Sequence, residues 1–267
     1  MKKVQAAVLV IGLVASLCSG VAQQKSEVGI AGAKAAVIQF INFSKQQALR
    51  SPEARKLLIG EALQWDTPTF GNLATSPDKT ILLSKETAVA RVQWYGQDNY
   101  VADFYFYLIS DVSWKIVTMR RLALTGIVEM AYNGLKAKKS LTSEERDELS
   151  NLELVLASDE ALRAWFGKNL ASMNRLRALT HSIPKGEYVF LNHQDKNYPE
   201  IGKLLKELHF SGLEVQQDGN VQMTIGGVTD NTVGFIYSAS NHPPPISPGP
   251  YIWVEQVADK WFLFRTT

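Results

Sequence analysis

The residues best suited to chemistry lie together in one short stretch. Asp103, Tyr105 and Tyr107 alternate with two phenylalanines. In a β-strand, this alternation places the carboxylate and both tyrosine hydroxyls on the same face. An aspartate that is shielded from water beside tyrosine hydroxyls could act as a general base. The alternative is a solvated face on which Asp103 pairs with Arg91 of a neighbouring strand. Asp103 is thus the catalytic candidate of this stretch, and both interpretations stay open.

Two helices and a strand meander must position these residues. Apolar residues at helical spacing predict an amphipathic helix over residues 31–50. A second helix over Ser51–Leu63 begins with an N-cap serine and a proline at the first helical position. From Thr80 the apolar period changes to two. Strands are therefore predicted over three ranges, namely 87–95, 100–109 and 114–121.

The rest of the chain predicts a helical segment followed by a second sheet. A capping box at Thr142–Glu145 and a helix start at Ser158 mark the helices. A helix over 199–209 follows, with strands over 188–191, 213–216, 221–225, 232–239, 251–257 and 261–265. The fold class is therefore α+β. We divide the chain into a signal peptide (1–22), an α+β domain (23–125), a helical connecting segment (126–182) and a C-terminal α+β domain (183–267).

The N-terminus has the three parts of a secretory signal peptide. Two lysines precede an apolar stretch from Val4 to Leu17, and Gly20 and Ala22 supply small residues before a cleavage site. The apolar stretch is shorter than the ~20 residues that a transmembrane helix needs. We therefore expect an exported chain, periplasmic or secreted, with no integral membrane segment. Lipid anchoring at Cys18 is the alternative, although Leu17 departs from the small residue that lipoprotein processing uses.

The charge balance argues against nucleic acid as a partner. The formal net charge is +2. Removal of Lys2 and Lys3 with the signal peptide takes it to zero, because residues 1–22 carry no other charge. A neutral, evenly mixed surface gives no electrostatic footprint for a phosphate backbone.

The order of elements over about residues 30–125 resembles the nuclear-transport-factor-2-like superfamily, also called SnoaL-like. The residues that carry this resemblance are the two helices, the stretch Ala88–Val92, Val101–Leu108 and the closing Trp114–Val117. The resemblance implies a cone-like fold in which a curved antiparallel sheet wraps helices and leaves a pocket. The superfamily includes isomerases and dehydratases alongside binding and dimerisation modules, so the fold alone does not choose a function.

The resemblance also implies where a ligand would bind. Trp65, Arg91, Tyr105 and Tyr107 are the candidate ligand-binding residues of that pocket. Enzymes of the superfamily use an aspartate or histidine base, and all four histidines of this chain lie after residue 180. A homodimer is a further possibility that the family suggests.

Other chemical signatures are weak. His193 and Asp195 form a short cluster without a second pair of metal ligands. Gly226-Gly227 is not followed by a phosphate-binding lysine, and no GxSxG motif is present. We therefore predict neither a metal nor a cofactor.

A proline-rich stretch is the most distinctive loop of the chain. Residues 241–250 hold five of its ten prolines. Such a stretch favours an extended conformation that costs little entropy to present to a partner. His242, Pro244, Pro245 and Tyr251 are the candidate partner-binding residues, and a stiff connection between two strands is the alternative.

Three functions agree with these patterns. The first is an exported, non-catalytic binding or assembly module for a small apolar ligand or a protein partner. The second is a small-molecule enzyme with Asp103 as its base. The third is an envelope scaffold that contacts partners through the proline-rich loop.

Overall fold

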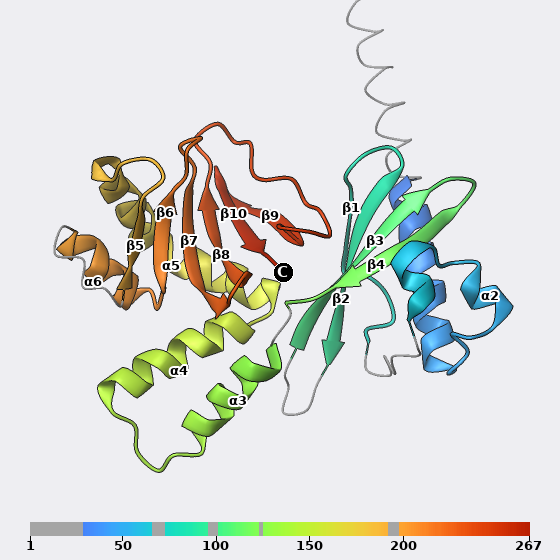
Figure 1. Cartoon of the computed structure of the whole chain (residues 1–267), viewed down its shortest axis with the longest axis horizontal. Helices are drawn as coiled ribbons and strands as arrows, with labels where there is room; N and C mark the ends of the chain where they lie inside the picture. Colours follow the sequence, from blue (N-terminus) through green and yellow to red (C-terminus); the bar gives the residue numbers. More distant parts are fainter. Residues whose placement is uncertain (1–28, 66–72, 96–100, 123–124, 192–197) are drawn as a thin grey trace, which may run out of the picture. The chain divides into compact units, whose positions relative to one another are not determined.

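A computed structural model describes residues 29–65, 73–95, 101–122, 125–191 and 198–267. The chain forms two compact units. The first contains the described residues up to Trp94 together with Phe104–Met119, and the second contains Tyr95–Asp103 and Arg120–Thr267. Each unit combines helices with an antiparallel sheet (Figure 1). The fold is therefore α+β, as the sequence predicts.

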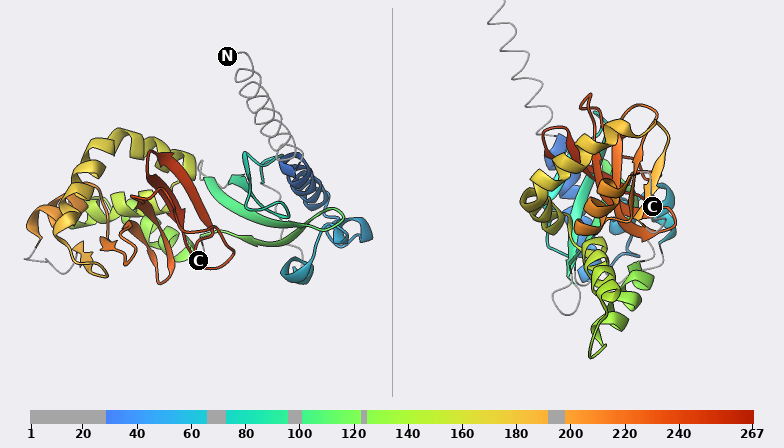
Figure 2. Two further views of the ribbon diagram at one scale, coloured as in Figure 1. Left: turned by 90° about the horizontal axis from the view of Figure 1, so that it is seen from above. Right: turned by 90° about the vertical axis from the view of Figure 1, so that its left-hand side faces the viewer.

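The first unit places a helix beside a four-stranded sheet. Residues 29–45 are helical, and the strands are β1 (Lys79–Leu82), β2 (Thr87–Tyr95), β3 (Val101–Ser110) and β4 (Trp114–Arg120), in the order β1-β2-β3-β4. Figure 2 shows that the long strands of this sheet are curved. Phe40 of the helix packs against Phe106 of β3, with ring centroids 5.5 Å apart. The predicted helix and all three predicted strands are confirmed.

The predicted second helix is much shorter than Ser51–Leu63. Helix α2 covers only Pro52–Arg55, and a 3-10 turn follows over Gly60–Gln64. The Ile59 N–H donates to the carbonyl of Ile116 at 3.0 Å, and the Ile116 N–H donates to Leu57 at 2.7 Å. The backbone thus pairs with β4 where the helix would have continued. Gly60, with φ of +59°, allows the reversal that follows.

The second unit contains four helices and a six-stranded sheet among its described elements. The helices are α3 (Thr125–Lys136), α4 (Ser143–Leu156), α5 (Asp159–Leu179) and α6 (Pro199–Glu207), with a 3-10 turn at Thr180–Ser182. The strands are β5 (Tyr188–Phe190), β6 (Gly212–Val215), β7 (Val221–Val228), β8 (Asn231–Tyr237), β9 (Trp253–Ala258) and β10 (Trp261–Arg265). Their order is β5-β6-β7-β8-β10-β9. The last strand in the chain therefore lies inside the sheet.

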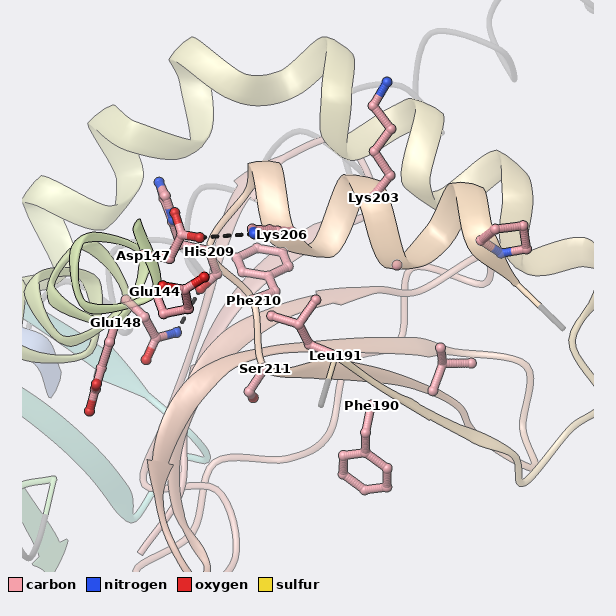
Figure 3. Close-up of a pocket in the computed structure, with 14 residues that line it drawn as sticks. Glu144, Asp147, Glu148, Phe190, Leu191, Lys203, Lys206, His209, Phe210 and Ser211 are labelled. Atoms are coloured by element: carbon pink, nitrogen blue, oxygen red, sulfur yellow. Dashed lines mark hydrogen bonds and ion pairs between the residues drawn. The ribbon is translucent and has the colours of Figure 1, made fainter. Parts of the chain in front are cut away.

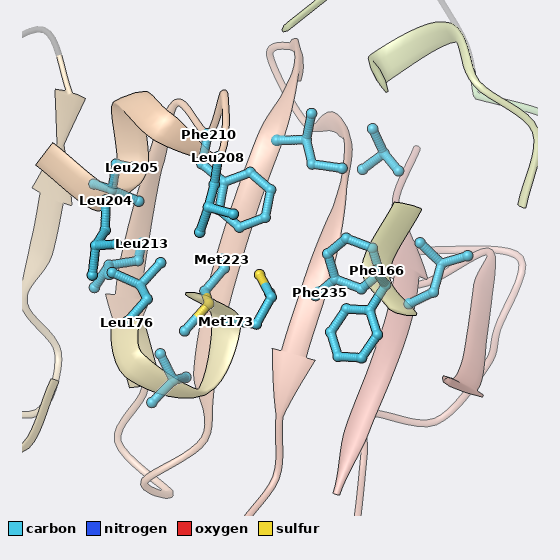
Figure 4. Close-up of a cluster of buried hydrophobic side chains, with 14 of the residues drawn as sticks. Phe166, Met173, Leu176, Leu204, Leu205, Leu208, Phe210, Leu213, Met223 and Phe235 are labelled. Carbon is cyan, nitrogen blue, oxygen red and sulfur yellow. The ribbon is translucent and has the colours of Figure 1, made fainter. Parts of the chain in front are cut away.

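Helices α5 and α6 bury their apolar faces against one face of this sheet. Phe166 of α5 lies 4.9 Å from Phe235 of β8 between ring centroids, and Met173 lies beside Met223 (Figure 4). Phe166 and Met173 of α5 therefore belong to the hydrophobic core. No described helix has the length and apolar character needed to cross a membrane.

The opposite face of the sheet is partly covered by the proline-rich stretch. Ile246 and Tyr251 pack against a small apolar cluster. Its buried members lie on β8, β9 and β10, namely Ile236, Val254, Phe262 and Phe264. The stretch thus shields apolar side chains from water, which accounts for its position between two strands.

Candidate functional site

An open groove lies between α4, α6 and the end of β5 in the second unit. Its volume is about 960 Å³, which is at the upper end of the range for small-molecule sites. Apolar side chains of Leu191 and the buried Phe210 line it (Figure 3). Charged side chains from α4 and α6 line it as well. The groove therefore combines an apolar lining with charged walls, as binding sites for amphipathic ligands do.

Helix α4 presents one polar face to this groove. Glu144, Asp147, Glu148 and Asn151 recur at positions i, i+3, i+4 and i+7, which places them on the same side of the helix. The helix begins with the predicted capping box, in which Thr142 and Glu145 each accept a hydrogen bond from the other's backbone N–H. Hydrogen bonds from Lys138 and the Thr142 N–H hold the pKa of the Glu145 carboxyl below its ordinary value.

The charges of the groove do not cancel. Lys206 of α6 forms an ion pair with Asp147 of α4 at 3.2 Å, which joins the two helices (Figure 3). In the described part of the chain, the side chains of Glu144 and Glu148 make neither a hydrogen bond nor an ion pair. Lys203 lies 3.9 Å from Glu207, one turn along its own helix. Two carboxylates thus remain without a cationic partner, and the electrostatics favour a positively charged group in the groove.

His209 adopts a strained backbone conformation at the end of α6. Its φ is +56°, in the left-handed region that costs roughly 1 kcal/mol for a residue with a Cβ. The Phe210 N–H donates to Leu205 O at 2.8 Å, and the His209 N–H donates to Lys206 O at 3.1 Å. These two bonds form a Schellman motif, in which this position usually holds glycine.

The side chain of His209 adds a second unfavourable feature. Its Nδ1 is shielded from solvent and has no hydrogen-bond partner in the described structure. A buried nitrogen without a partner costs about 1–3 kcal/mol. His209 is also one of the residues that line the groove. A strained residue with an unmet polar atom at a groove points to a functional role.

Asn151 fixes the position of α4 beside this turn. Its Nδ2 donates to the carbonyls of His209 at 2.7 Å and Ile225 at 2.6 Å. The close approach depends on Gly226, because a Cβ there would lie 2.9 Å from Val155 and 3.0 Å from Asn151. The Gly226-Gly227 pair therefore serves a register shift in β7 and the packing of α4.

The predicted site residues lie outside the groove. Asp103 is 6% exposed, so the interpretation that places it on a solvated face is wrong. Its Oδ2 accepts a hydrogen bond from the Asp159 N–H at 2.7 Å, where it meets the positive end of α5. Arg91 is also buried, and its Nε donates to Asp78 at 2.9 Å. Both side chains form hydrogen bonds inside the protein because a buried charged group is unfavourable without a partner.

The other predicted ligand-binding residues are packed in the first unit. Tyr105 is fully buried and Tyr107 is 5% exposed. Trp65 is half-buried and makes an edge contact with Phe40, with ring centroids 5.9 Å apart. A smaller cavity of about 500 Å³ in this unit is lined by four residues between Gln39 and Gln46 and by Glu53, Lys56 and Leu57. None of the residues predicted to bind a ligand lines that cavity.

The candidate partner-binding residues are spread along the proline-rich stretch. His242 and Pro245 are exposed, whereas Pro244 is half-buried. The His242 N–H donates to Ser238 Oγ at 3.0 Å. The hydroxyl of Tyr251 donates to Gln222 at 2.9 Å, and burial raises the pKa of Tyr251. Tyr251 is therefore engaged with the sheet beneath it.

A tyrosine and a glutamate face each other at the edge of the second sheet. Tyr188 of β5 is paired in register with Glu214 of β6. A hydrogen bond to Glu214, reinforced by partial burial, raises the pKa of Tyr188 to about 12. The ring of Tyr188 stacks on Phe190, and both side chains are about half exposed.

Metal binding finds no support in the described residues. No group of three or more histidine, cysteine, aspartate or glutamate side chains is placed to hold an ion there. The predicted cluster of His193 and Asp195 lies outside the residues that the structure describes.

Comparison of the chain with protein-family models, with curated proteins and with solved structures found no match.

Proposed function

We propose that this chain is a non-catalytic binding protein that holds a small amphipathic ligand with a basic group in the groove between α4 and α6. The observation that carries the proposal is His209, a strained residue with an unmet buried nitrogen, in the lining of an open groove of about 960 Å³. Residues with such costs are concentrated where a protein binds a ligand.

The ligand class follows from the lining. Leu191 and Phe210 favour an apolar body. The carboxylates of Glu144 and Glu148 favour a cation, because Asp147 is the acid that Lys206 neutralises. At about 6 Å and an effective dielectric constant of about 40, each carboxylate contributes about 1.4 kcal/mol toward a cation, or about tenfold in affinity.

Alkyl probes with the same chain and different head groups test this proposal. Decyltrimethylammonium, decyl sulfate and decyl maltoside would be titrated below their micelle-forming concentrations and followed by calorimetry. We expect the ammonium probe to bind at least about tenfold more tightly than the sulfate. Mass spectrometry of protein purified from its native source would then identify the natural ligand.

Charge-neutral variants localise the site. The double variant Glu144→Gln and Glu148→Gln should lose most of the preference for the ammonium probe. Glu160→Gln is the matched control, because Glu160 is exposed on α5 and does not line the groove. Equal binding of the ammonium and sulfate probes, or an unchanged preference in the double variant, would contradict the proposal.

Export and the nuclear-transport-factor-2-like relationship belong to the same proposal. The basic and apolar N-terminal sequence supports export. A helix packed beside a curved antiparallel sheet in the first unit supports the relationship. The enzyme alternative has less support, because Asp103 lines neither the groove nor the smaller cavity and its carboxylate accepts the hydrogen bond at the start of α5.

A further inference from the structure

Helix α3 is apolar over more of its surface than its neighbour covers. Its polar residues are Thr125, Glu129, Asn133 and Lys136, which recur every three or four positions and form one narrow stripe. The remaining positions are apolar residues or glycines. At 100° per residue, the apolar arc spans about 200° of the helix circumference.

Helix α4 covers about half of this arc. Val128 and Leu135 are buried, and the hydroxyl of the half-buried Tyr132 lies 3.4 Å from Glu153 of α4. The other half faces solvent. There Ile127 is 55% exposed and Met130 is 76% exposed.

The exposed half has a pattern of large and small residues. Ile127 and Met130 are large, whereas Ala131 and Gly134, also exposed, are small. Apart from the backbone of α3 itself, no atom of the described residues lies within 4 Å of the position that a Cβ on Gly134 would occupy. The four residues, which we call the α3 stripe, carry no charge, so their exposure is unfavourable and their burial is not opposed by repulsion.

The α3 stripe is complementary to itself. In an antiparallel pair with a two-fold axis between residues 130 and 131, Met130 faces Ala131 of the second copy. Ile127 and Gly134 lie equally far from this axis on opposite sides. Ile127 therefore likewise faces Gly134 of the second copy. Each large side chain thus meets a small one, which lets the two helices interdigitate closely. Asn133 and Lys136 of the polar stripe stay exposed outside this contact.

We propose that two copies of this chain associate through the α3 stripe in an antiparallel, two-fold symmetric contact. Two-fold contacts of this kind use the same surface on both copies. The helix has 12 residues, or about 18 Å of contact length, which places the interface in the weak class below about 1,200 Å². The dimer should therefore be weak, with a dissociation constant of about 10–300 µM. This inference does not depend on the proposed ligand.

Sedimentation velocity of the full chain over about 5–500 µM tests the contact in the range expected for a weak interface. The wild-type chain should pass from monomer to dimer, and Met130→Lys should stay monomeric. Asn133→Lys is the matched control, since it adds the same charge on the polar stripe and should dimerise like the wild type. Both sites are exposed, so circular dichroism should show both variants folded.

Gly134→Leu tests whether dimerisation depends on the pairing of large with small side chains or only on exposed apolar surface. A leucine at this position fills the space that Ile127 of the second copy needs, so dimerisation should weaken at least about fivefold. Tighter dimerisation of Gly134→Leu would mean that any apolar surface suffices, and it would overturn the antiparallel pairing. A wild-type chain that stays monomeric over the whole range, or a Met130→Lys variant that still dimerises, would overturn the proposal itself.

Discussion

Replacing Arg265 tests how the second unit is held together. Its Nε donates to Asp159 Oδ1 at 2.7 Å, and its Nη2 donates to the Ala157 carbonyl at 2.6 Å. Asp159 is fully buried and Arg265 is 5% exposed. Asp159 is the first residue of α5 and Arg265 is the last of β10. The ion pair therefore ties the end of the chain to the start of the long helix.

Arg265→Met removes the charge and keeps an apolar stem of similar reach. Breaking a buried ion pair from one side costs about 3–5 kcal/mol, because the other charge stays buried. The hydrogen bond to Ala157 adds about 1 kcal/mol. The positive end of α5 offsets part of this loss. We therefore expect the free energy of unfolding of the second unit to fall by about 3 kcal/mol. Adding Asp159→Asn should recover about 1–2 kcal/mol, because a neutral amide costs less to bury than a carboxylate.

Urea unfolding followed by tryptophan fluorescence measures this change. Trp253 and Trp261 are buried in the second unit and report on its transition. With a slope of about 1–3 kcal/mol per molar urea, a loss of 3 kcal/mol lowers the midpoint by about 1–3 M. A loss below about 1 kcal/mol is the size expected for an exposed pair, and it would refute the assignment of this pair as a buried tie.

Three further predictions follow from named contacts. His209→Gly should raise the free energy of unfolding by about 1 kcal/mol, because glycine relieves the left-handed backbone and removes the buried nitrogen; a lower melting temperature would contradict this. Glu214→Gln should return the pKa of Tyr188 from about 12 toward its ordinary value, as read by NMR titration of the tyrosine ring carbons. Because the folded-state pKa is raised, the stabilisation from this pair is present below pH ~10 and is lost as the pH rises toward 12. An unchanged pKa of Tyr188 in the variant would contradict the hydrogen bond to Glu214. Deletion of residues 263–267 removes most of β10, which lies between β8 and β9, and should abolish the cooperative unfolding of the second unit; a native-like transition by circular dichroism would show that β10 is dispensable.

Elements with strong local signals could be predicted from the sequence. The two predicted strands over 213–216 and 221–225 form a hairpin around Asp218-Gly219, where Gly219 has φ of +86°. The capping box at Thr142 and the helix start at Ser158 are also present. These features depend on residues close together in sequence, so their physical causes are visible in a short window. The predicted length of the second helix was wrong because the backbone after α2 pairs with β4, more than 50 residues away in sequence.

The candidate site could not be predicted in the same way. Its walls come from α4 and α6, and its lining from the segment around Phe210, so it exists only after long-range packing. Glu144, Asp147 and Glu148 at helical spacing are typical of a solvated helix face. Asp103 shows the converse, because alternation suggested an exposed or catalytic carboxylate and the long-range contact with α5 gave it a structural role. A local signal existed only at His209, where a histidine occupies the glycine position of a helix end.

The substitution His209→Gly distinguishes a ligand-binding role of this histidine from a purely structural one. If His209 stabilised the turn, His209→Gly would lower both the stability and the binding of the ammonium probe. If its cost is borne for a ligand, the same substitution raises the stability and lowers the binding. The strained backbone and the buried nitrogen then disappear together with the side chain of a residue that lines the groove. Only the second interpretation gives changes of opposite sign. The pair of measurements on this one variant therefore decides whether the groove between α4 and α6 is where the protein functions.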